Sequence, residues 1–494
     1  MNADNNNNGF RERTTHQKAG LWLGPIVAIA MIVAGPPDSL ASAGWNTAAI
    51  GMLMAIWWAT EAVPIAVTAM LPLVLFPPLG IADIDSAAAP FANKVIFLFL
   101  GGFVIALAMQ RWNLHHRIAL TVLQYAGRSG QSLVGGFMLA CALLSMWVSN
   151  TSTAMMMMPI ALSIIEVMQR SMPGQDERER RDFQVALLLG IAYAASIGGM
   201  TTLVGSPPNA MMAAFLRDSY GFEIDFAHWL LIGLPICVTL LPLTWLVLTR
   251  LAFRVDFTTS NEGRALLKSM KTELGVISRP EKRVATIFFL VGVTWIFRPL
   301  LTKLPGLEEV DDSGIAMAGA IALFLLPSGD KDDPMLLRWQ HIEKLPWNIL
   351  ILFGGGLALA AAVTDTGLAD WLGANLHAVA ALPVPLLVVI VTTMIIFLTE
   401  LTSNTATAAT FLPVVGAVAV EAGIDPLLLA VPVTLAASCA FMLPVATPPN
   451  AIVFGSGMLT IPQMAKTGII LNLIGIVLVS LIALTIAPYV LQGR

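Results

Sequence analysis

The sequence predicts an all-α polytopic membrane protein. Hydrophobic residues make up 57% of its 494 residues and charged residues only 12%, and the mean hydropathy is +0.78. A soluble domain carries about 25% charged residues, so a water-soluble protein of this length could not bury so much apolar surface. The composition argues against a soluble enzyme or a disordered scaffold, and a net charge of −4 is too small to indicate a nucleic-acid partner.

Long stretches without Asp, Glu, Lys or Arg define the predicted spans. Most fit one helix of about 20 residues, but 129–165, 183–216 and 426–465 are too long for one helix and awkward for two. Non-helical backbone is tolerated at membrane depth only where it is buried in protein or lines a cavity. We therefore predict about 11 transmembrane helices, two re-entrant hairpins and two discontinuous helices, with breaks at SNTST (149–153), GGMTTLVGSPPN (198–209), TSNTAT (402–407) and PVATPPN (444–450).

Basic loops set the predicted orientation, because they stay on the cytoplasmic side. Arg and Lys gather in the N-terminal tail, in 111–128 and in 250–283, whereas 308–312 reads EEVDD. With 11 crossings, a cytoplasmic N-terminus places the basic segments inside and places EEVDD and the C-terminus outside. The segment 111–127 is amphipathic and is expected to lie on the cytoplasmic interface; an ordinary soluble helix is the alternative.

The chain contains an internal repeat with offsets of 254 and 241 residues. Three motifs recur in the same order: F-x-G-G (99–102 and 353–356), Ser-Asn-Thr or SNT (149–151 and 403–405), and SPPN or TPPN (206–209 and 447–450). The first SNT follows a cytoplasmic segment and the second follows an outward crossing, so the two halves are predicted to have opposite topology. Inverted repeats with broken helices that meet near the midplane are typical of secondary transporters.

The four breaks offer a neutral polar site. Ser206 and Thr447 each precede a proline, and a hydroxyl N-cap followed by Pro favours a helix start. Two half-helices are therefore expected to begin at mid-membrane with positive dipole ends. Ser, Thr and Asn supply the oxygen ligands that hard cations prefer. The pattern predicts an anion site flanked by two cation sites.

Charge balance favours sodium coupling. The motifs contain no Arg or Lys, so the charge of a multivalent anion would be offset by co-transported cations and helix dipoles. We expect Asn150 and Asn404 to be functional. Glu400 is open to two interpretations, a proton or cation ligand and a buried anchor. For the remaining hydroxyl residues near the tips, interhelical hydrogen bonding and ligation are both open: these are Ser145, Thr153, Thr399 and Thr407.

At these motifs the chain resembles the divalent anion/sodium symporter family, bacterial dicarboxylate transporter type. The resemblance extends from about residue 20 to the end. It is carried by MAIWWATEAVPIAVTAMLPLVLFP (54–77), SMWVSNTSTAMMMMPI (145–160), VGSPPNA (204–210), TELTSNTATAATFLPV (399–414) and PVATPPNA (444–451).

The resemblance implies an 11-helix protomer, a homodimer and an elevator mechanism. It also implies particular site residues. The first sodium site would be formed by Ser145, Ser149, Asn150 and Gly205, and the second by Thr399, Thr402, Asn404 and Ala446. Substrate carboxylates would meet Asn150, Thr151, Ser206, Ser403, Asn404, Thr405 and Thr447.

The predicted domain boundaries follow from the repeat and the resemblance. They are a disordered cytoplasmic tail (1–19), scaffold helices of repeat 1 (20–128), the hairpin and discontinuous helix of repeat 1 in the transport domain (129–249), a cytoplasmic loop (250–283), scaffold helices of repeat 2 (284–383), and the hairpin and discontinuous helix of repeat 2 in the transport domain (384–494).

The predicted function is sodium-coupled symport of C4-dicarboxylates such as succinate, malate and fumarate across the cell or inner membrane. The alternatives are a dicarboxylate exchanger and a citrate or sulfate carrier of the same family; a channel fits the closed hairpins less well. No HExxH, GxSxG or paired-Asp motif lies in a span, so an enzyme is not expected. Sodium is the expected co-transported ion, and the expected partners are the dicarboxylate, the lipid bilayer and a second copy of the chain, with no nucleic acid.

Overall fold

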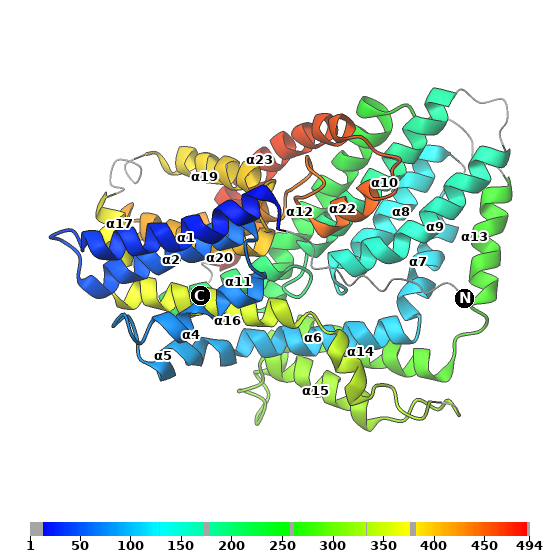
Figure 1. Ribbon diagram of the computed structural model, residues 1–494. Helices are drawn as coiled ribbons and strands as arrows, with labels where there is room; N and C mark the ends of the chain where they lie inside the picture. The colour runs from blue at the N-terminus through cyan, green and yellow to red at the C-terminus, as the bar shows by residue number, and fades with distance from the viewer. Residues whose placement is uncertain are drawn as a thin grey trace, which may run out of the picture.

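The computed structural model describes residues 13–127, 129–171, 177–256, 261–331, 333–375 and 382–491, and within them the chain is helical (Figure 1). An isolated antiparallel bridge joins Pro327 and Met335. Eight helices in the described residues are long and apolar enough to cross a membrane, and five shorter apolar helices accompany them. The exact number of 11 crossings stays a prediction.

The first half of the chain runs from α1 to the end of α12. It contains α1 (Thr15–Ala34), α2 (Ser42–Thr60), α3 (Ile65–Ala69), α4 (Leu71–Leu75), α5 (Ile84–Ala88), the 3₁₀ helix η1 (Ala89–Ala92), α6 (Lys94–Arg111), α7 (Leu114–Gln124), α8 (Gly130–Ser145), α9 (Asn150–Ser171), α10 (Glu177–Gly199), α11 (Pro207–Tyr220), α12 (Phe226–Leu246) and the π-helical stretch η2 (Val247–Ala252) that continues α12.

The second half begins with an amphipathic helix and ends with the longest helix described. It contains α13 (Asn261–Glu273), α14 (Arg279–Leu301), α15 (Asp312–Leu325), the 3₁₀ helix η3 (Trp339–Lys344), α16 (Trp347–Asp365), α17 (Leu368–Asn375), α19 (Val384–Thr399), α20 (Asn404–Glu421), α21 (Leu427–Ala437), α22 (Pro448–Phe454) and α23 (Ile461–Leu491).

Side-chain caps fix several helix starts. Asn93 Oδ1 accepts from Val95 N at 3.0 Å at the start of α6. Ser278 and Glu281 form a reciprocal capping box at the start of α14. These bonds satisfy N–H groups that a helix leaves without partners in its first turn.

Helix α1 begins earlier than the predicted boundary at residue 19. The Gln17 side chain accepts from Thr14 N at 3.0 Å, and α1 is helical from Thr15. The cap lets the helix extend into polar sequence, which composition had assigned to the tail. Residues 1–12 of the predicted tail lie outside the described residues.

The amphipathic segment predicted at 111–127 forms α7. The Arg117 guanidinium donates to both carboxylate oxygens of Glu281, at 2.8 and 3.2 Å, and to the carbonyls of Leu274 and Gly275. Burial lowers the pKa of His115 to about 4, so its imidazole is neutral at physiological pH. Helix α7 is therefore held against the α13–α14 connection, and its position on the membrane interface stays a prediction.

The helices are interrupted at the four predicted places, with shifted bounds. The turns between α8 and α9 and between α19 and α20 occupy 146–149 and 400–403, and the other two breaks occupy 200–206 and 438–447. The SNT residues mostly form the first turns of α9 and α20, because Ser, Thr and Asn favour helix starts over mid-helix positions. The re-entrant placement of the two hairpins stays a prediction.

The two half-helices cross over to the opposite repeat. Helix α11 packs on α20 and α21, whereas α22 packs on α9 and α10. Figure 1 shows α22 lying beside α10, a helix of the first repeat. This exchange packs each half-helix against helices of the other repeat.

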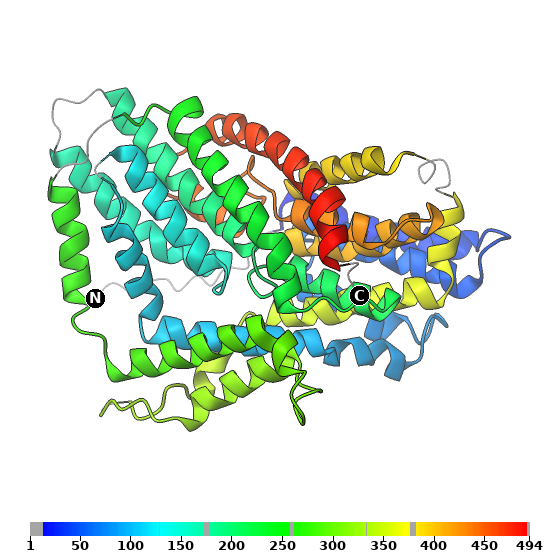
Figure 2. The ribbon, with the colours of Figure 1, turned by 180° about the vertical axis from the view of Figure 1, so that it is seen from behind.

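The remaining helices form a flank around this centre. Helices α6, α14 and α15 pack together along one edge, and α1 packs on α2 (Figure 1). Figure 2 shows α12 in green beside α23 in red, and the two helices are in contact. The order hairpin, broken helix, long helix thus occurs twice in the chain, as α8 to α12 and as α19 to α23.

Candidate functional site

The first hairpin tip joins a hydroxyl to an amide. Helix α8 ends at Ser145 and α9 begins at Asn150. The Ser145 hydroxyl donates to Asn150 Oδ1 at 2.5 Å. Ser145 is fully buried, whereas Asn150 is partly exposed. Because the buried hydroxyl donates its hydrogen bond to the amide oxygen, the lone pairs of the hydroxyl oxygen remain available to a further ligand.

Two glycines bring main-chain oxygens against this pair. A Cβ atom on Gly199 would lie 2.5 Å from Asn150 Oδ1, and one on Gly205 would lie 2.6 Å from Gly199 O and 3.1 Å from Ser145 O. Any side chain would therefore displace the backbone from the tip. The result is a group of neutral oxygens from α8, α9 and the α10–α11 break, the ligand type that hard cations prefer.

Of the four residues predicted for the first sodium site, the structure brings three together. Ser145, Asn150 and Gly205 converge as described. The fourth, Ser149, makes local bonds: its hydroxyl accepts from Ser152 N at 3.3 Å and donates to Ser152 Oγ at 2.9 Å. Gly199 belongs to this group but was not predicted as a ligand; its sequence signal was the Gly-Gly pair that ends α10.

The second hairpin tip repeats the bond 254 positions later. The Thr399 hydroxyl lies 2.9 Å from Asn404 Oδ1 and 2.9 Å from the carbonyl of Ala437, which ends α21. Thr399 is fully buried. The position of Ser145 is thus taken by Thr399, and the position of Asn150 by Asn404, with the same hydrogen bond in both tips.

The other residues predicted for the second sodium site have local roles. The Thr402 hydroxyl lies 3.0 Å from Leu398 O, to which it can donate, and 2.6 Å from Thr407 Oγ1. Ala446 is buried, and its amide donates to Leu443 O at 3.3 Å within the break. Ala437 contributes a carbonyl that was not predicted, because its position depends on where α21 ends.

The asparagine of each Pro-Pro-Asn motif closes its break. Asn209 Nδ2 donates to Gly199 O at 3.1 Å and Thr202 O at 2.8 Å. Asn450 Nδ2 donates to Ala440 O at 3.1 Å and to Leu443 O at 3.0 Å, the same pattern 241 positions later. Both asparagines are fully buried. The sequence motif includes both asparagines, but its pattern predicts no role for them.

The two hydroxyls that precede the prolines differ in their contacts. Thr447 Oγ1 accepts from Asn450 N at 3.3 Å and so acts as the predicted N-cap of α22. Ser206 occupies the N-cap position of α11 without making this bond. Its hydroxyl lies 3.4 Å from Ser438 Oγ, just beyond α21. The predicted helix start at Ser206 is therefore confirmed, but its hydroxyl connects the two repeats and does not cap the helix.

The residues predicted to meet substrate lie at or beside helix N-termini. Asn150 and Thr151 open α9, and Ser403 is the N-cap residue before Asn404 and Thr405. Ser403 makes no side-chain cap bond. N-terminal N–H groups and dipoles of this kind attract anions. The hydrogen bonds above do not join the two tips directly.

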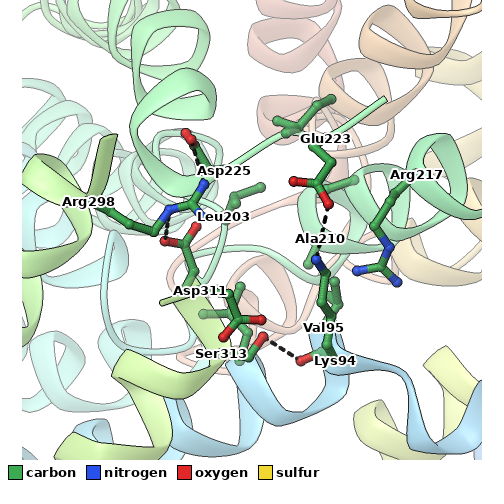
Figure 3. Close-up of a pocket in the computed structure, with 14 residues that line it drawn as sticks. Lys94, Val95, Leu203, Ala210, Arg217, Glu223, Asp225, Arg298, Asp311 and Ser313 are labelled. Atoms are coloured by element: carbon green, nitrogen blue, oxygen red, sulfur yellow. Dashed lines mark hydrogen bonds and ion pairs between the residues drawn. The ribbon is translucent and has the colours of Figure 1, made fainter. Parts of the chain in front are cut away.

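A charged cavity lies beside the first break (Figure 3). Arg298, near the end of α14, contacts Asp225 at 2.7 Å and Asp312 at 3.0 Å. Burial alone would raise the pKa of Asp225, but His228 and Arg298 hold it well below its ordinary value. Leu203 from the break and Ala210 of α11 line the same cavity.

Two hairpins that face two broken helices, with neutral oxygens at the tips, define a membrane transporter of the secondary type. The chain belongs to the sodium:sulfate symporter family, whose transmembrane region matches residues 16–491. A symporter moves solutes without converting them, so membership confirms the prediction that the chain is not an enzyme. It also confirms the family suggested by the motifs.

Two relatives are named sodium-dependent dicarboxylate transporters SdcS. The protein of Staphylococcus saprophyticus is 42% identical over 478 residues, covering 96% of this chain and 92% of the relative. A protein of Staphylococcus aureus is 43% identical over 481 residues, covering 97% and 92%.

Two solved structures share the fold at low identity. The Neisseria gonorrhoeae MtrF structure, from a class of antimetabolite efflux pumps, has a TM-score of 0.57 at 11% identity and covers 94% of each chain. The Alcanivorax borkumensis YdaH transporter has a TM-score of 0.50 at 14% identity and covers 97% of this chain and 98% of that one. These likenesses confirm the predicted class, an all-α polytopic membrane protein.

Proposed function

We propose that the chain is a secondary active transporter that couples the movement of sodium to that of C4-dicarboxylates such as succinate, malate and fumarate. The observation that carries the proposal is the repeated bond Ser145–Asn150 and Thr399–Asn404, which places matched groups of neutral oxygens at two tips. The names of the two staphylococcal relatives support both the ion and the substrate class.

The site chemistry fits a dianion accompanied by cations. Hydroxyls, amides and helix N-termini can bind carboxylates through N–H and O–H donors. The recurring motifs contain no Arg or Lys, so sodium ions would supply the balancing charge. The oxygen groups at Ser145–Asn150 and Thr399–Asn404 would each hold one ion, with Gly199, Gly205 and Ala437 contributing main chain.

The repeated order of helices suggests two groups that can be assigned to two bodies. Helices α8 to α12 and α19 to α23 contact one another through the exchanged half-helices and through α12 and α23. We assign them to a transport domain, with 20–128 and 284–383 as the scaffold and 250–283 as a cytoplasmic loop. In this proposal the transport domain moves against the scaffold as an elevator, in a homodimer, in the cell or inner membrane, with the N-terminus cytoplasmic and the C-terminus external.

The test is radiolabelled succinate uptake into proteoliposomes. An inward sodium gradient is compared with choline, and malate, citrate and sulfate are added as competitors. We expect uptake that needs sodium and is blocked by malate. Uptake that instead needs internal dicarboxylate and no sodium would show an exchanger and not a symporter. Uptake that is blocked by sulfate or citrate but not by malate would overturn the proposed substrate class.

Variants of the two tips connect this activity to the site. Asn150→Ala and Asn404→Ala each remove the amide oxygen that meets the buried hydroxyl, so each is expected to abolish sodium-dependent uptake. Glu421→Gln, at the C-terminal end of α20, is the matched control and should retain sodium-dependent uptake. Wild-type uptake in either asparagine variant contradicts the proposed site.

A further inference from the structure

Glu400 is a buried carboxylate in the second hairpin turn. It follows Thr399 directly and is 3% exposed. Its Oε1 accepts from Phe441 N at 2.7 Å, from Met442 N at 2.9 Å and from Asn472 Nδ2 at 2.8 Å. Its Oε2 accepts from Met442 N and Leu443 N, both at 3.0 Å. Of the two interpretations that the sequence left open, these bonds support the anchor.

The hydrogen bonds favour the ionised form of Glu400. Both carboxylate oxygens face N–H donors, so a proton on either oxygen would point at another donor and displace an accepted bond. Three backbone amides and one side-chain amide replace the water that burial removes from the charge. A full negative charge is thus fixed beside Thr399.

The same peptide segment is held from its other side. The carbonyls of Ala440 and Leu443 accept from Asn450 Nδ2, and the carbonyl of Ala437 lies 2.9 Å from the Thr399 hydroxyl. The segment 437–443 therefore gives its N–H groups to Glu400 and its carbonyls to Asn450 and Thr399. Its geometry, and with it the position of the Ala437 oxygen, depends on the carboxylate.

The first repeat has no such charge. The offset of 254 places Met146 opposite Glu400. There the Thr202 hydroxyl donates to the carbonyl of Met146 at 2.5 Å and accepts from Gly205 N at 3.0 Å. A neutral hydroxyl thus holds the first break, whereas a carboxylate holds the second. The two oxygen groups share the hydroxyl–asparagine pair and are unequal in charge.

We propose that Glu400 is a positioning residue that makes the second cation site bind sodium more tightly than the first. The carboxylate holds the 441–443 amides in the segment whose Ala437 carbonyl meets Thr399. Its charge, one residue from Thr399 in the chain, would attract a cation through a medium of low dielectric constant. The inference rests on the proposed sodium coupling. It adds an order to the two sites, with the second site filled at lower sodium concentration.

The experiment compares Glu400→Gln with wild type and with Glu421→Gln, which removes a carboxylate from the outer end of the same hairpin. The readouts are the sodium concentration that half-saturates succinate uptake, the KM for succinate at saturating sodium, and the thermal stabilisation of the purified protein by sodium alone. Glu400→Gln is expected to raise the sodium half-saturation by about tenfold or more and to lose most of the sodium-induced stabilisation. Glu421→Gln should leave both unchanged.

A purely structural anchor predicts a different result. It would lower the amount of folded protein and the maximal rate, with an unchanged sodium half-saturation, and that outcome overturns the inference. If Glu400→Gln fails to fold, Glu400→Asp provides the test, because it keeps the charge on a shorter side chain that cannot reach all three amides. Glu400→Asp should raise the sodium concentration at half-saturation by less than the tenfold expected for loss of the charge. A sodium half-saturation equal to that of wild type overturns the inference. Absence of sodium-dependent uptake in wild type would instead contradict the proposed function.

Discussion

At the scale of single residues, the same hydrogen bond occurs in both hairpin tips of the candidate site. Ser145 and Thr399 are fully buried hydroxyls that end a helix, and each meets the amide oxygen of an asparagine that begins the next helix. The bond fixes the side-chain rotamer of the asparagine and leaves further lone pairs on both oxygens. Such a pair can hold a small cation without adding charge to the hairpin tip.

Removal of these hydroxyls should weaken sodium binding without removing the amides. Ser145→Ala and Thr399→Ala are each expected to raise the sodium half-saturation of succinate uptake several-fold, because a ligand and the hydrogen bond that orients Asn150 or Asn404 are lost together. The exchanges Ser145→Thr and Thr399→Ser keep a hydroxyl and should stay close to wild type. Equal sodium curves for all four variants would show that the hydroxyls only pack.

Gly199 is predicted to tolerate no side chain. A Cβ atom there would lie 2.5 Å from Asn150 Oδ1 and 3.0 Å from Gly205 O, so Gly199→Ala is expected to abolish sodium-dependent uptake while the protein still inserts. Gly51→Ala is the matched control, because its Cβ atom would meet Leu359 at an ordinary 3.5 Å. Uptake and membrane abundance are measured together, and normal uptake by Gly199→Ala would contradict the geometry of the first site.

At the scale of helices, a buried ion-pair network joins α12, α14 and α15. Arg298 contacts Asp225 and Asp312, and Asp312 Oδ2 also accepts from Phe226 N at 2.7 Å. Asp225 is 5% exposed and Asp312 8% exposed. These contacts connect one helix of the proposed transport domain to two helices of the proposed scaffold.

Loss of the arginine should destabilise the protein strongly. Arg298→Ala removes the cation shared by two buried carboxylates, and breaking a buried pair in this way costs about 3–5 kcal/mol. Lys94→Ala removes a pair with Glu223 whose side chains are 44% and 54% exposed, which is worth about 1 kcal/mol or less. Purified Arg298→Ala should therefore unfold at a lower temperature than Lys94→Ala. Equal melting temperatures would show that the network does not contribute to stability.

At the scale of the whole molecule, orientation can be measured with introduced cysteines. The three native cysteines, Cys141, Cys237 and Cys439, are buried, so labelling by a membrane-impermeant maleimide should have a low background. Ser269 and Glu309 are exposed positions in the proposed cytoplasmic and external loops.

We expect Glu309→Cys to be labelled in intact cells and Ser269→Cys only after permeabilisation. The reason is the charge of the loops: α13 lies in the basic region 250–283, whereas Glu309 lies in the acidic run 308–312. The uptake of succinate by both variants serves as the check that they fold. The reverse labelling pattern would invert the proposed topology.

The repeat and the composition made much of this predictable. The charge-free stretches and their polar interruptions indicated the four breaks, because a bilayer forces every backbone group to be satisfied inside the segment or within the protein. The offset of 254 residues by itself pairs Asn150 with Asn404 and Ser145 with Thr399. The bounds of the breaks were less predictable, since Ser, Thr and Asn can end a helix or begin the next.

Hydrophobicity and motif spacing are local properties of the chain, so they suffice to predict the helical membrane class, the repeat and the hydroxyl and amide residues of the two tips. Which main-chain atoms join those tips depends on the tertiary structure. The exchange of α11 and α22 between repeats, the close approach of Gly199 to Asn150 and the anchoring of residues 441–443 by Glu400 all depend on segments far apart in sequence. Such contacts follow from how packed helices place their ends, and neither residue type nor spacing encodes that position.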